Sequence, residues 1–288
     1  KYILHNRSIF FSNDDEVKHF LEKRSIENSK KHQQPATLNV KSNLDKLTLN
    51  DMQVFRFNFR HEKNQKILYL HGGYNTLQPS PFHWRLLDKL TLNTLHEVVL
   101  PIYPKSPDYH YLETFKAIRD VYNQLVEEVG ANNIVMMGDG SGGGLALSFV
   151  QSLINDNQEV PRKLFLLSPL LDATLTNPNI TKTLEENDIL VSRFGVHQLM
   201  KSWTNDLPLS DARISPLYGT LKGLPPIYMY GGGREILSPD MHAFTHALEE
   251  CGNDVEFKEY PKMVHDFPIY PIRQSHKVLK HITKSILE

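Results

Sequence analysis

The stretch Asn133–Leu147, NIVMMGDGSGGGLAL, decides the fold of this chain. Four apolar residues, Ile134 to Met137, lead into a glycine-rich turn, and helix-forming residues follow at once. A strand that ends at a sharp turn opening a helix is how α/β proteins present a reactive side chain, or a phosphate cradle, at the carboxyl edge of a sheet. The residue at the apex of this turn therefore determines what the protein does.

Other strand-like runs alternate with amphipathic helical patterns along the chain. Such alternation is typical of a mostly parallel sheet with helices on both faces, so we predict an α/β fold. The predicted strands are Val54–Phe59, Lys66–Leu70, Glu97–Leu100, Ile134–Met137, Lys163–Leu167, Ile227–Tyr230 and Val255–Tyr260. Helical patterns cover residues 12–32 and run from Phe115 to Leu125, from Ser238 to Cys251 and from Val278 to Ile286.

Two segments do not fit this alternation. They are residues 1–50 and residues 173–213, and the second carries an apolar patch of its own inside polar sequence (Val196, Leu199, Met200, Trp203). An insertion with its own apolar face suits a cap over the sheet edge, although a plain surface excursion is the alternative. We therefore assign 1–50 and 173–213 to a cap, and 51–172 with 214–288 to the core.

Composition limits the partners and the compartment. The chain has 288 residues, which is enough to bury a sizeable core, and its formal net charge is −1. It has no global basic field, so neither nucleic acid nor an anionic membrane is expected as a partner. The single cysteine, Cys251, cannot form an intrachain disulfide, which fits a reducing, cytoplasmic location. Whether a leader or an anchor precedes Lys1 stays open.

The segment His71-Gly72-Gly73 directly follows a predicted strand. Paired glycines let backbone N–H groups approach a ligand closely, and two such donors can form an oxyanion hole. An isolated sequence of this kind is more often a plain tight turn. The catalytic interpretation therefore depends on what else gathers at the same edge of the sheet.

The glycine-rich turn also matches the dinucleotide-binding pattern G-x-G-x-x-G through Gly138, Gly140 and Gly143. Asp156 lies near the position where an acidic residue is expected to bind the ribose. Against this interpretation, the turn follows several strands instead of the first, no second nucleotide-binding half follows, and the HGG segment would have no role. A phosphate-binding P-loop is excluded because no Gly-Lys-Ser/Thr follows.

A serine, an acid and a histidine each follow a predicted strand. Ser141, Glu235 and His265 appear in this order, which is the order of the α/β-hydrolase triad. His265 is one of fourteen histidines and is distinguished by its position alone. Asp240 is a rival acid, but its place in the first turn of a helix already explains its carboxylate.

Together these motifs resemble the hormone-sensitive-lipase branch of the α/β-hydrolases, bacterial esterases of the fold-3 type, from about residue 66 to the C-terminus. The resemblance rests on the HGG segment, on the glycine-rich turn at residues 138–144 (the elbow), and on the loops that carry Glu235 and His265. It also rests on Tyr103-Pro104, Ser106-Pro107, Leu167–Asp172 and Ile214–Gly219. It implies a cap from the N-terminus and the insertion, with ester hydrolysis beneath it. It also implies Glu235 as the triad acid, where Asp is commoner, and His265 as the base, where HGF is commoner than HDF.

No metal or organic cofactor is expected, because the sequence has neither an HExxH motif nor a paired-cysteine site. The expected partner is a small or medium acyl ester. A homodimer through an edge strand is common in such folds, and the sequence leaves the oligomeric state open.

The elbow departs from the pattern of the family it resembles, which reads Gly-Asp-Ser-Ala-Gly-Gly. Without a gap, Gly138 and Asp139 match, the nucleophile position falls on Gly140, and Ser141 replaces the alanine. The apex residue has strained backbone angles that glycine adopts most easily. With Ser141 at the apex, the charged Asp139 would occupy the tight position two residues before it.

Two interpretations follow. In the first, the turn slips by one residue and Ser141 is the nucleophile. His265 takes the proton of Ser141, and Glu235 stabilises the imidazolium that forms. The N–H groups of Gly72, Gly73 and Gly142 then bind the oxyanion. In the second, Gly140 is the apex and Ser141 supplies an N–H group. The protein is then a weak hydrolase that uses water, or a ligand-binding relative. We predict a carboxylic ester hydrolase with Ser141, Glu235 and His265 as its triad.

Overall fold

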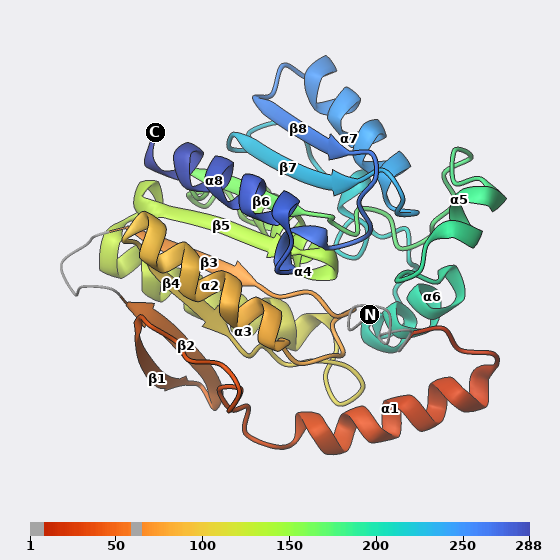
Figure 1. The fold of residues 1–288 in the computed structure, drawn as a ribbon, viewed down its shortest axis with the longest axis horizontal. Coiled ribbons are helices and arrows are strands. Elements are labelled where there is room, and N and C mark those ends of the chain that lie inside the picture. Colours follow the sequence, from red (N-terminus) through yellow and green to blue (C-terminus); the bar gives the residue numbers. More distant parts are fainter. Residues whose placement is uncertain (1–8, 59–64) are drawn as a thin grey trace.

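The computed structural model describes residues 9–58 and 65–288, which build one eight-stranded sheet with helices on both faces (Figure 1). The strands lie side by side in the order β1-β2-β4-β3-β5-β6-β7-β8. Their bounds are β1 Asn43–Leu49, β2 Met52–Asn58, β3 Lys66–Leu70, β4 Glu97–Pro101, β5 Ile134–Asp139, β6 Lys163–Leu167, β7 Ile227–Gly232 and β8 Val255–Tyr260.

Strands β3 to β8 run parallel, whereas β1 and β2 form an antiparallel edge joined to β4. The seven predicted strands are confirmed, and Phe59, the last residue of the first of them, lies outside the described residues. The sequence did not indicate β1, because its residues are mostly exposed and show no apolar alternation. Since β1 pairs with β2, residues 43–49 belong to the sheet and not to the cap segment to which we assigned them.

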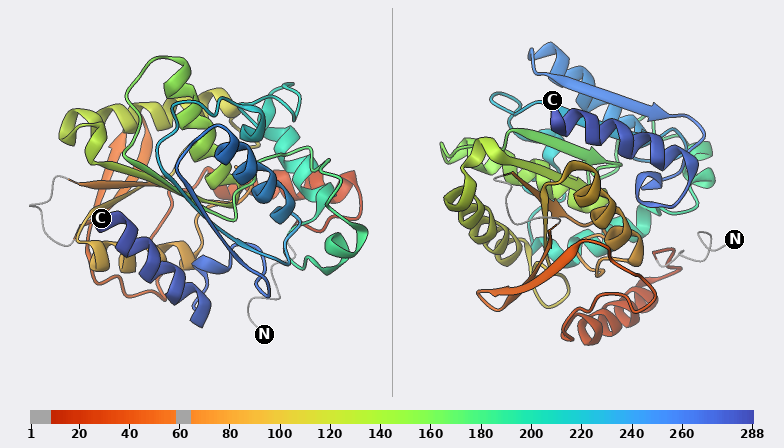
Figure 2. Two further views of the ribbon diagram at one scale, coloured as in Figure 1. Left: turned by 90° about the horizontal axis from the view of Figure 1, so that it is seen from above. Right: turned by 60° about the vertical axis from the view of Figure 1, so that its left-hand side comes forward.

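Two apolar layers hold the helices against the sheet. Alternate residues of each central strand point to opposite faces, so that Leu68 and Met136 join one layer while Ile67 and Met137 join the other. Figure 2 shows the sheet between the two groups of helices. One face carries α3 (Tyr111–Val129), α4 (Gly140–Asn155) and α7 (Ser238–Glu250), and the other carries α2 (Pro81–Thr94) and α8 (Arg273–Leu287).

The N-terminal helix and the insertion lie side by side, beyond the carboxyl ends of the parallel strands (Figure 1). Their helices are α1 (Asp14–Asn28), α5 (Lys182–Asn187) and α6 (Arg193–Thr204). The amide of Gln198 in α6 donates to the Asp14 carboxylate at 3.1 Å. Trp203 anchors α6 on the core: its ring is buried, and its indole N–H donates to the Thr114 hydroxyl at 2.9 Å.

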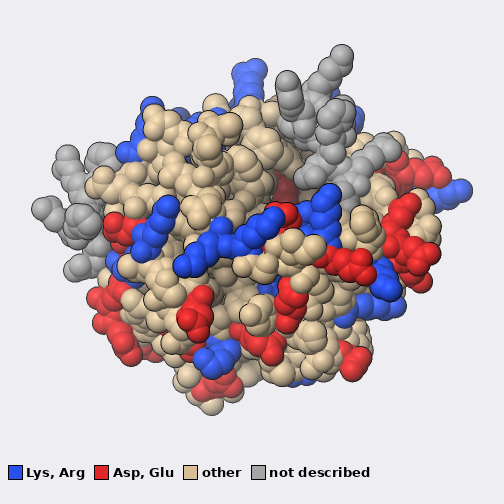
Figure 3. Space-filling model, turned by 90° about the horizontal axis from the view of Figure 1, so that it is seen from below, with Lys and Arg blue, Asp and Glu red and all other residues tan. Residues whose placement is uncertain are grey.

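The surface carries charges of both signs. Figure 3 shows lysines and arginines interspersed with acidic side chains on the face seen from below, in keeping with a net charge of −1. Within the described ranges, every helix is too short or too polar to cross a bilayer.

The attachment of the insertion can be tested with two aromatic residues of α6. We expect Trp203→Ala to lower the free energy of unfolding by about 3–5 kcal/mol, because it leaves a large cavity and removes a buried hydrogen bond. Phe194→Ala is the matched control; this ring is 37% exposed, and its loss should change the same quantity by less than about 0.5 kcal/mol. Urea unfolding of both variants measures the difference, and equal effects would contradict the anchoring role of Trp203.

Candidate active site

The elbow is built from glycines because no side chain fits there. A Cβ atom added to Gly142 would overlap the carbonyl oxygens of Leu70 and His71, and one added to Gly138 would overlap the backbone of Gly142. Strand β5, helix α4 and the end of β3 therefore meet backbone to backbone. This close approach fixes the start of α4 at Gly140.

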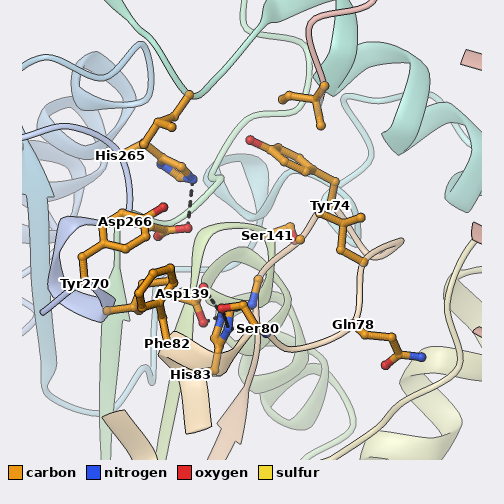
Figure 4. Close-up of a pocket in the computed structure, with 16 residues that line it drawn as sticks. Tyr74, Gln78, Ser80, Phe82, His83, Asp139, Ser141, His265, Asp266 and Tyr270 are labelled. Carbon is orange, nitrogen blue, oxygen red and sulfur yellow. Dashed lines mark hydrogen bonds and ion pairs between the residues drawn. The ribbon is translucent and has the colours of Figure 1, made fainter. Parts of the chain in front are cut away.

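Gly140 stands at the apex of the turn. Its φ is +51°, in the left-handed region that favours glycine, and a Cβ built on it would lie 3.4 Å from Nε2 of His265. The hydroxyl of Ser141 instead accepts a hydrogen bond from the backbone N–H of Asn75 at 3.3 Å. Throughout the described part of the chain, no hydrogen bond joins Ser141 to His265, and Figure 4 shows Ser141 apart from the imidazole. The structure thus has the second of our two registers, with Gly140 in the nucleophile position.

Glu235 and His265 meet as the sequence order suggested. Nδ1 of His265 lies 2.7 Å from Oε2 of Glu235, which is fully buried in the loop after β7. The other oxygen of Glu235 accepts from the Ser168 hydroxyl at 2.8 Å and from the Gly232 N–H at 2.6 Å. Because every oxygen of this carboxylate has a partner, its orientation is fixed, and it holds the ring of His265 in turn.

Asp266 occupies the space beside Gly140. Its Oδ2 lies 3.1 Å from Nε2 of His265 and 3.1 Å from the Cβ position built on Gly140 (Figure 4). The residue has a φ of +52°, a conformation that Asp tolerates better than most residues, and its N–H donates to the Ser168 hydroxyl at 3.1 Å. An aspartate carboxylate is thus the partner of the histidine nitrogen that would face a serine in the usual elbow.

The two carboxylates determine the charge of the histidine. Burial alone would lower the pKa of His265, but Asp266 and Glu235 outweigh it and raise this pKa well above 6.5. Burial raises the pKa of Asp266 to about 6, although the imidazolium opposes this shift. The two carboxylates therefore favour an imidazolium, in which each ring N–H can donate to one of them.

The expected oxyanion donors are only partly available. The N–H of Gly72 donates to Oδ1 of Asp139 at 3.0 Å, so it is already engaged, which contradicts its assignment to the oxyanion hole. Gly73, with φ of +113°, lines the cavity, and no described residue accepts a hydrogen bond from its N–H. Gly142 does not line the cavity. In the observed register, the N–H after the apex belongs to Ser141, in the first turn of α4, where N–H groups lack intrahelical partners.

A second buried ion pair, which the sequence analysis missed, lies beside the HGG loop at residues 71–73. Nε2 of His83 lies 3.0 Å from Oδ2 of Asp139, and the Tyr69 hydroxyl donates to Oδ1 at 2.6 Å. Burial opposes both charges, yet the pair raises the pKa of His83 and lowers that of Asp139. The available signal was Ser80-Pro81 at the start of α2, a capping sequence that places His83 in the first turn. Asp139 thus ties the HGG loop and α2 to the elbow.

These groups surround one cavity of about 160 Å³ at the carboxyl edge of the sheet. Its polar lining includes Gly73, His83, Asp139, Ser141, His265 and Asp266, and its apolar lining includes Tyr74, Leu77, Phe82, Ile269 and Tyr270. The described residues contain no group of three metal-type ligands. Asp240, the rival acid, lies outside the lining and accepts from the Asn177 amide at 2.8 Å.

Comparison with known proteins identifies the family of the chain. The family model described as alpha/beta hydrolase fold matches residues 67–269. An esterase of Acinetobacter venetianus is 34% identical over 208 residues, which are 72% of this chain and 68% of the esterase. This match leaves no place for the dinucleotide-binding interpretation of the glycine-rich turn.

Two solved structures share the fold. A putative esterase from Staphylococcus aureus is 64% identical, with a TM-score of 0.98 over 100% of this chain and 97% of that one. An esterase of the bacterial hormone-sensitive lipase family superposes with a TM-score of 0.84, at 20% identity, over 99% of this chain and 94% of its own. The fold class inferred from the motifs is thereby confirmed, and the chain belongs to the alpha/beta hydrolase fold family as an esterase- and lipase-like hydrolase.

Proposed function

We propose that this protein hydrolyses small carboxylic esters in the cavity lined by Ser141, His265 and Asp266, by direct attack of water and without an acyl-enzyme on Ser141. The observation that carries the proposal is the apex itself. Gly140 has no side chain to attack, while His265 and Glu235 keep the arrangement of a hydrolase site. A bound ester would be cleaved in one step between water and substrate, and not in two steps through the enzyme.

The cavity limits the size of the substrate. Its volume of about 160 Å³ is close to that of an engineered protein cavity of about 150 Å³, which accepts benzene. We therefore propose a short acyl group, with the alcohol part directed toward the opening. The rings of Tyr74, Phe82 and Tyr270 supply apolar contacts for such a group.

Backbone N–H groups supply the proposed oxyanion site. The donors are Gly73 and Ser141, one from the loop after β3 and one from the first turn of α4. Removing one such donor from a hydrolase typically slows turnover about 10²–10³-fold, so a site that keeps two donors retains substantial catalytic power without a nucleophile. The Ser141 hydroxyl, bound to Asn75, holds the HGG loop against the elbow in this proposal.

A ligand-binding role is the second candidate, and the same glycine favours it. If nothing in the site activates water, the cavity still offers N–H donors and an apolar lining to an ester or an acid. Saturable binding of a short-chain ester without its hydrolysis would identify this role.

Removing the Ser141 hydroxyl tests the register of the elbow. We expect Ser141→Ala to reduce kcat/KM for p-nitrophenyl acetate less than about tenfold, because its backbone N–H remains; an attacking serine would give a loss of about 10³-fold or more. Ser148→Ala is the matched control in α4, since its hydroxyl bonds to Ala212 and Arg213 carbonyls outside the cavity. A loss of about 10³-fold in Ser141→Ala alone would show that Ser141 attacks.

Installing a serine at the apex tests what the site lacks. We expect the double variant Gly140→Ser/Asp266→Gly to react covalently with a fluorophosphonate probe that does not label the natural chain. A side chain at position 140 would then face Nε2 of His265 without the competing Asp266 carboxylate. The left-handed backbone costs the serine about 1–2 kcal/mol, which the fold can absorb. Labelling is measured by mass spectrometry of the intact protein, with His265→Ala added as the control that should abolish it. Labelling of the natural chain at Ser141 would overturn the proposed function.

A further inference from the structure

We propose that Asp266 is the catalytic base that activates the attacking water, and that His265 serves as its positively charged partner. This inference rests on the proposed hydrolysis by water and names the group that drives it. It reverses the usual division of roles, in which the histidine takes the proton.

The position of the Asp266 carboxylate carries the argument. Oδ2 is held by Nε2 of His265 at 3.1 Å and lies 3.1 Å from the Cβ position of Gly140, where a serine hydroxyl would otherwise be. Oδ1 is buried and has no hydrogen-bond partner among the residues that the structure describes. Asp266 as a whole is 9% exposed and lines the cavity. A buried acceptor without a partner is costly unless a ligand satisfies it, so one oxygen of a carboxylate that lines the cavity is left to accept a proton.

His265 cannot take the proton while both of its ring nitrogens donate. In the imidazolium form that the two carboxylates favour, Nδ1–H donates to Glu235 and Nε2–H to Asp266, so neither nitrogen has a free lone pair. The carboxylate that receives the Nε2–H still has its second oxygen available. Among the described residues beside Gly140, Asp266 is therefore the group that is both basic and free to accept a proton.

The reaction balances without a cofactor. The Asp266 carboxylate takes a proton from water as the water oxygen bonds to the ester carbonyl carbon. The carbonyl electrons move to the oxygen, which the N–H groups of Gly73 and Ser141 stabilise. When the bond to the alkoxy oxygen breaks, the leaving alkoxide takes the proton from the Asp266 carboxylic acid. An acid and an alcohol leave, and the carboxylate is restored.

Several ionisable groups face Asp266 and set the pH at which it works. Burial raises its pKa to about 6, His265 lowers it, and the neighbouring carboxylates Asp139 and Glu235 raise it. The imidazole of His83 and the phenols of Tyr69, Tyr74 and Tyr270 also interact with it from the other sides. Because the base acts as the carboxylate, we expect kcat/KM to fall as the pH drops through about 6.

Asp266→Asn is the first test. The amide keeps the shape and tolerates the left-handed backbone, but it cannot take a proton, so we expect kcat/KM for p-nitrophenyl acetate to fall about 10²-fold or more. The fall in rate on acidification should disappear with the base. Asp240→Asn is the matched control, because burial also raises the pKa of this carboxyl to about 6 although it lies outside the cavity. Both kcat/KM and its fall at low pH should persist in this variant.

Chemical rescue is the second test, and a purely structural role would not respond to it. Asp266→Gly leaves an empty space at a backbone angle that suits glycine, and added formate should restore its hydrolysis about tenfold or more. Formate should not accelerate Asp266→Asn, whose amide fills the same space.

The outcomes separate this inference from the proposed function. If the natural chain hydrolyses the ester and Asp266→Asn keeps both the rate and its fall at low pH, Asp266 is not the base. The proposed hydrolase function would still stand. Heavy oxygen from labelled water found in the Asp266 side chain after turnover would show that it attacks the substrate, which also overturns the inference. If the natural chain is no faster than Asp266→Asn because neither hydrolyses the ester, both proposals fail together.

Discussion

The close approach of Gly138 and Gly142 to the backbone of their neighbours is the constraint on which the site depends. With no side chain between them, β5, α4 and the end of β3 contact one another directly. This contact fixes the first turn of α4, and with it the residue that stands at the apex. It also brings the loop after β3 next to the N–H groups of that turn, so one packing contact positions both halves of the proposed oxyanion site.

Electrostatic pairing then organises the cavity around this contact. Two buried histidines each pair with an aspartate, His83 with Asp139 and His265 with Asp266. The first pair has further partners and is closed, since Tyr69 and Gly72 satisfy the carboxylate. The second leaves one oxygen of Asp266 without a partner in the described part of the chain. Burial makes an incomplete pair costly, and proteins keep such pairs mainly where function requires them. In our proposal, this contrast separates a structural ion pair from a reactive one.

Much of this arrangement could be predicted from the sequence, because it depends on local patterns. Strand periodicity gave seven of the eight strands, and the order of Glu235 and His265 after their strands anticipated their contact. The exposed edge strand β1 lacked an apolar signal. The register of the elbow stayed open because it depends on Leu70, which is distant in the sequence and meets Gly142 only in the fold. The direction of the Asp266 side chain follows from its left-handed backbone, which no sequence pattern indicated.

The arrangement of residues 140 and 266 also bears on how such a site can evolve. The side chain that faces Nε2 of His265 comes from the histidine loop in this protein, and the elbow contributes none. A serine gained at position 140 while Asp266 remains would place two groups in a space that holds one. A lineage that passes between the two arrangements meets less steric conflict if it vacates one position before it fills the other. The intermediate with glycine at both positions is the sterically open route between them.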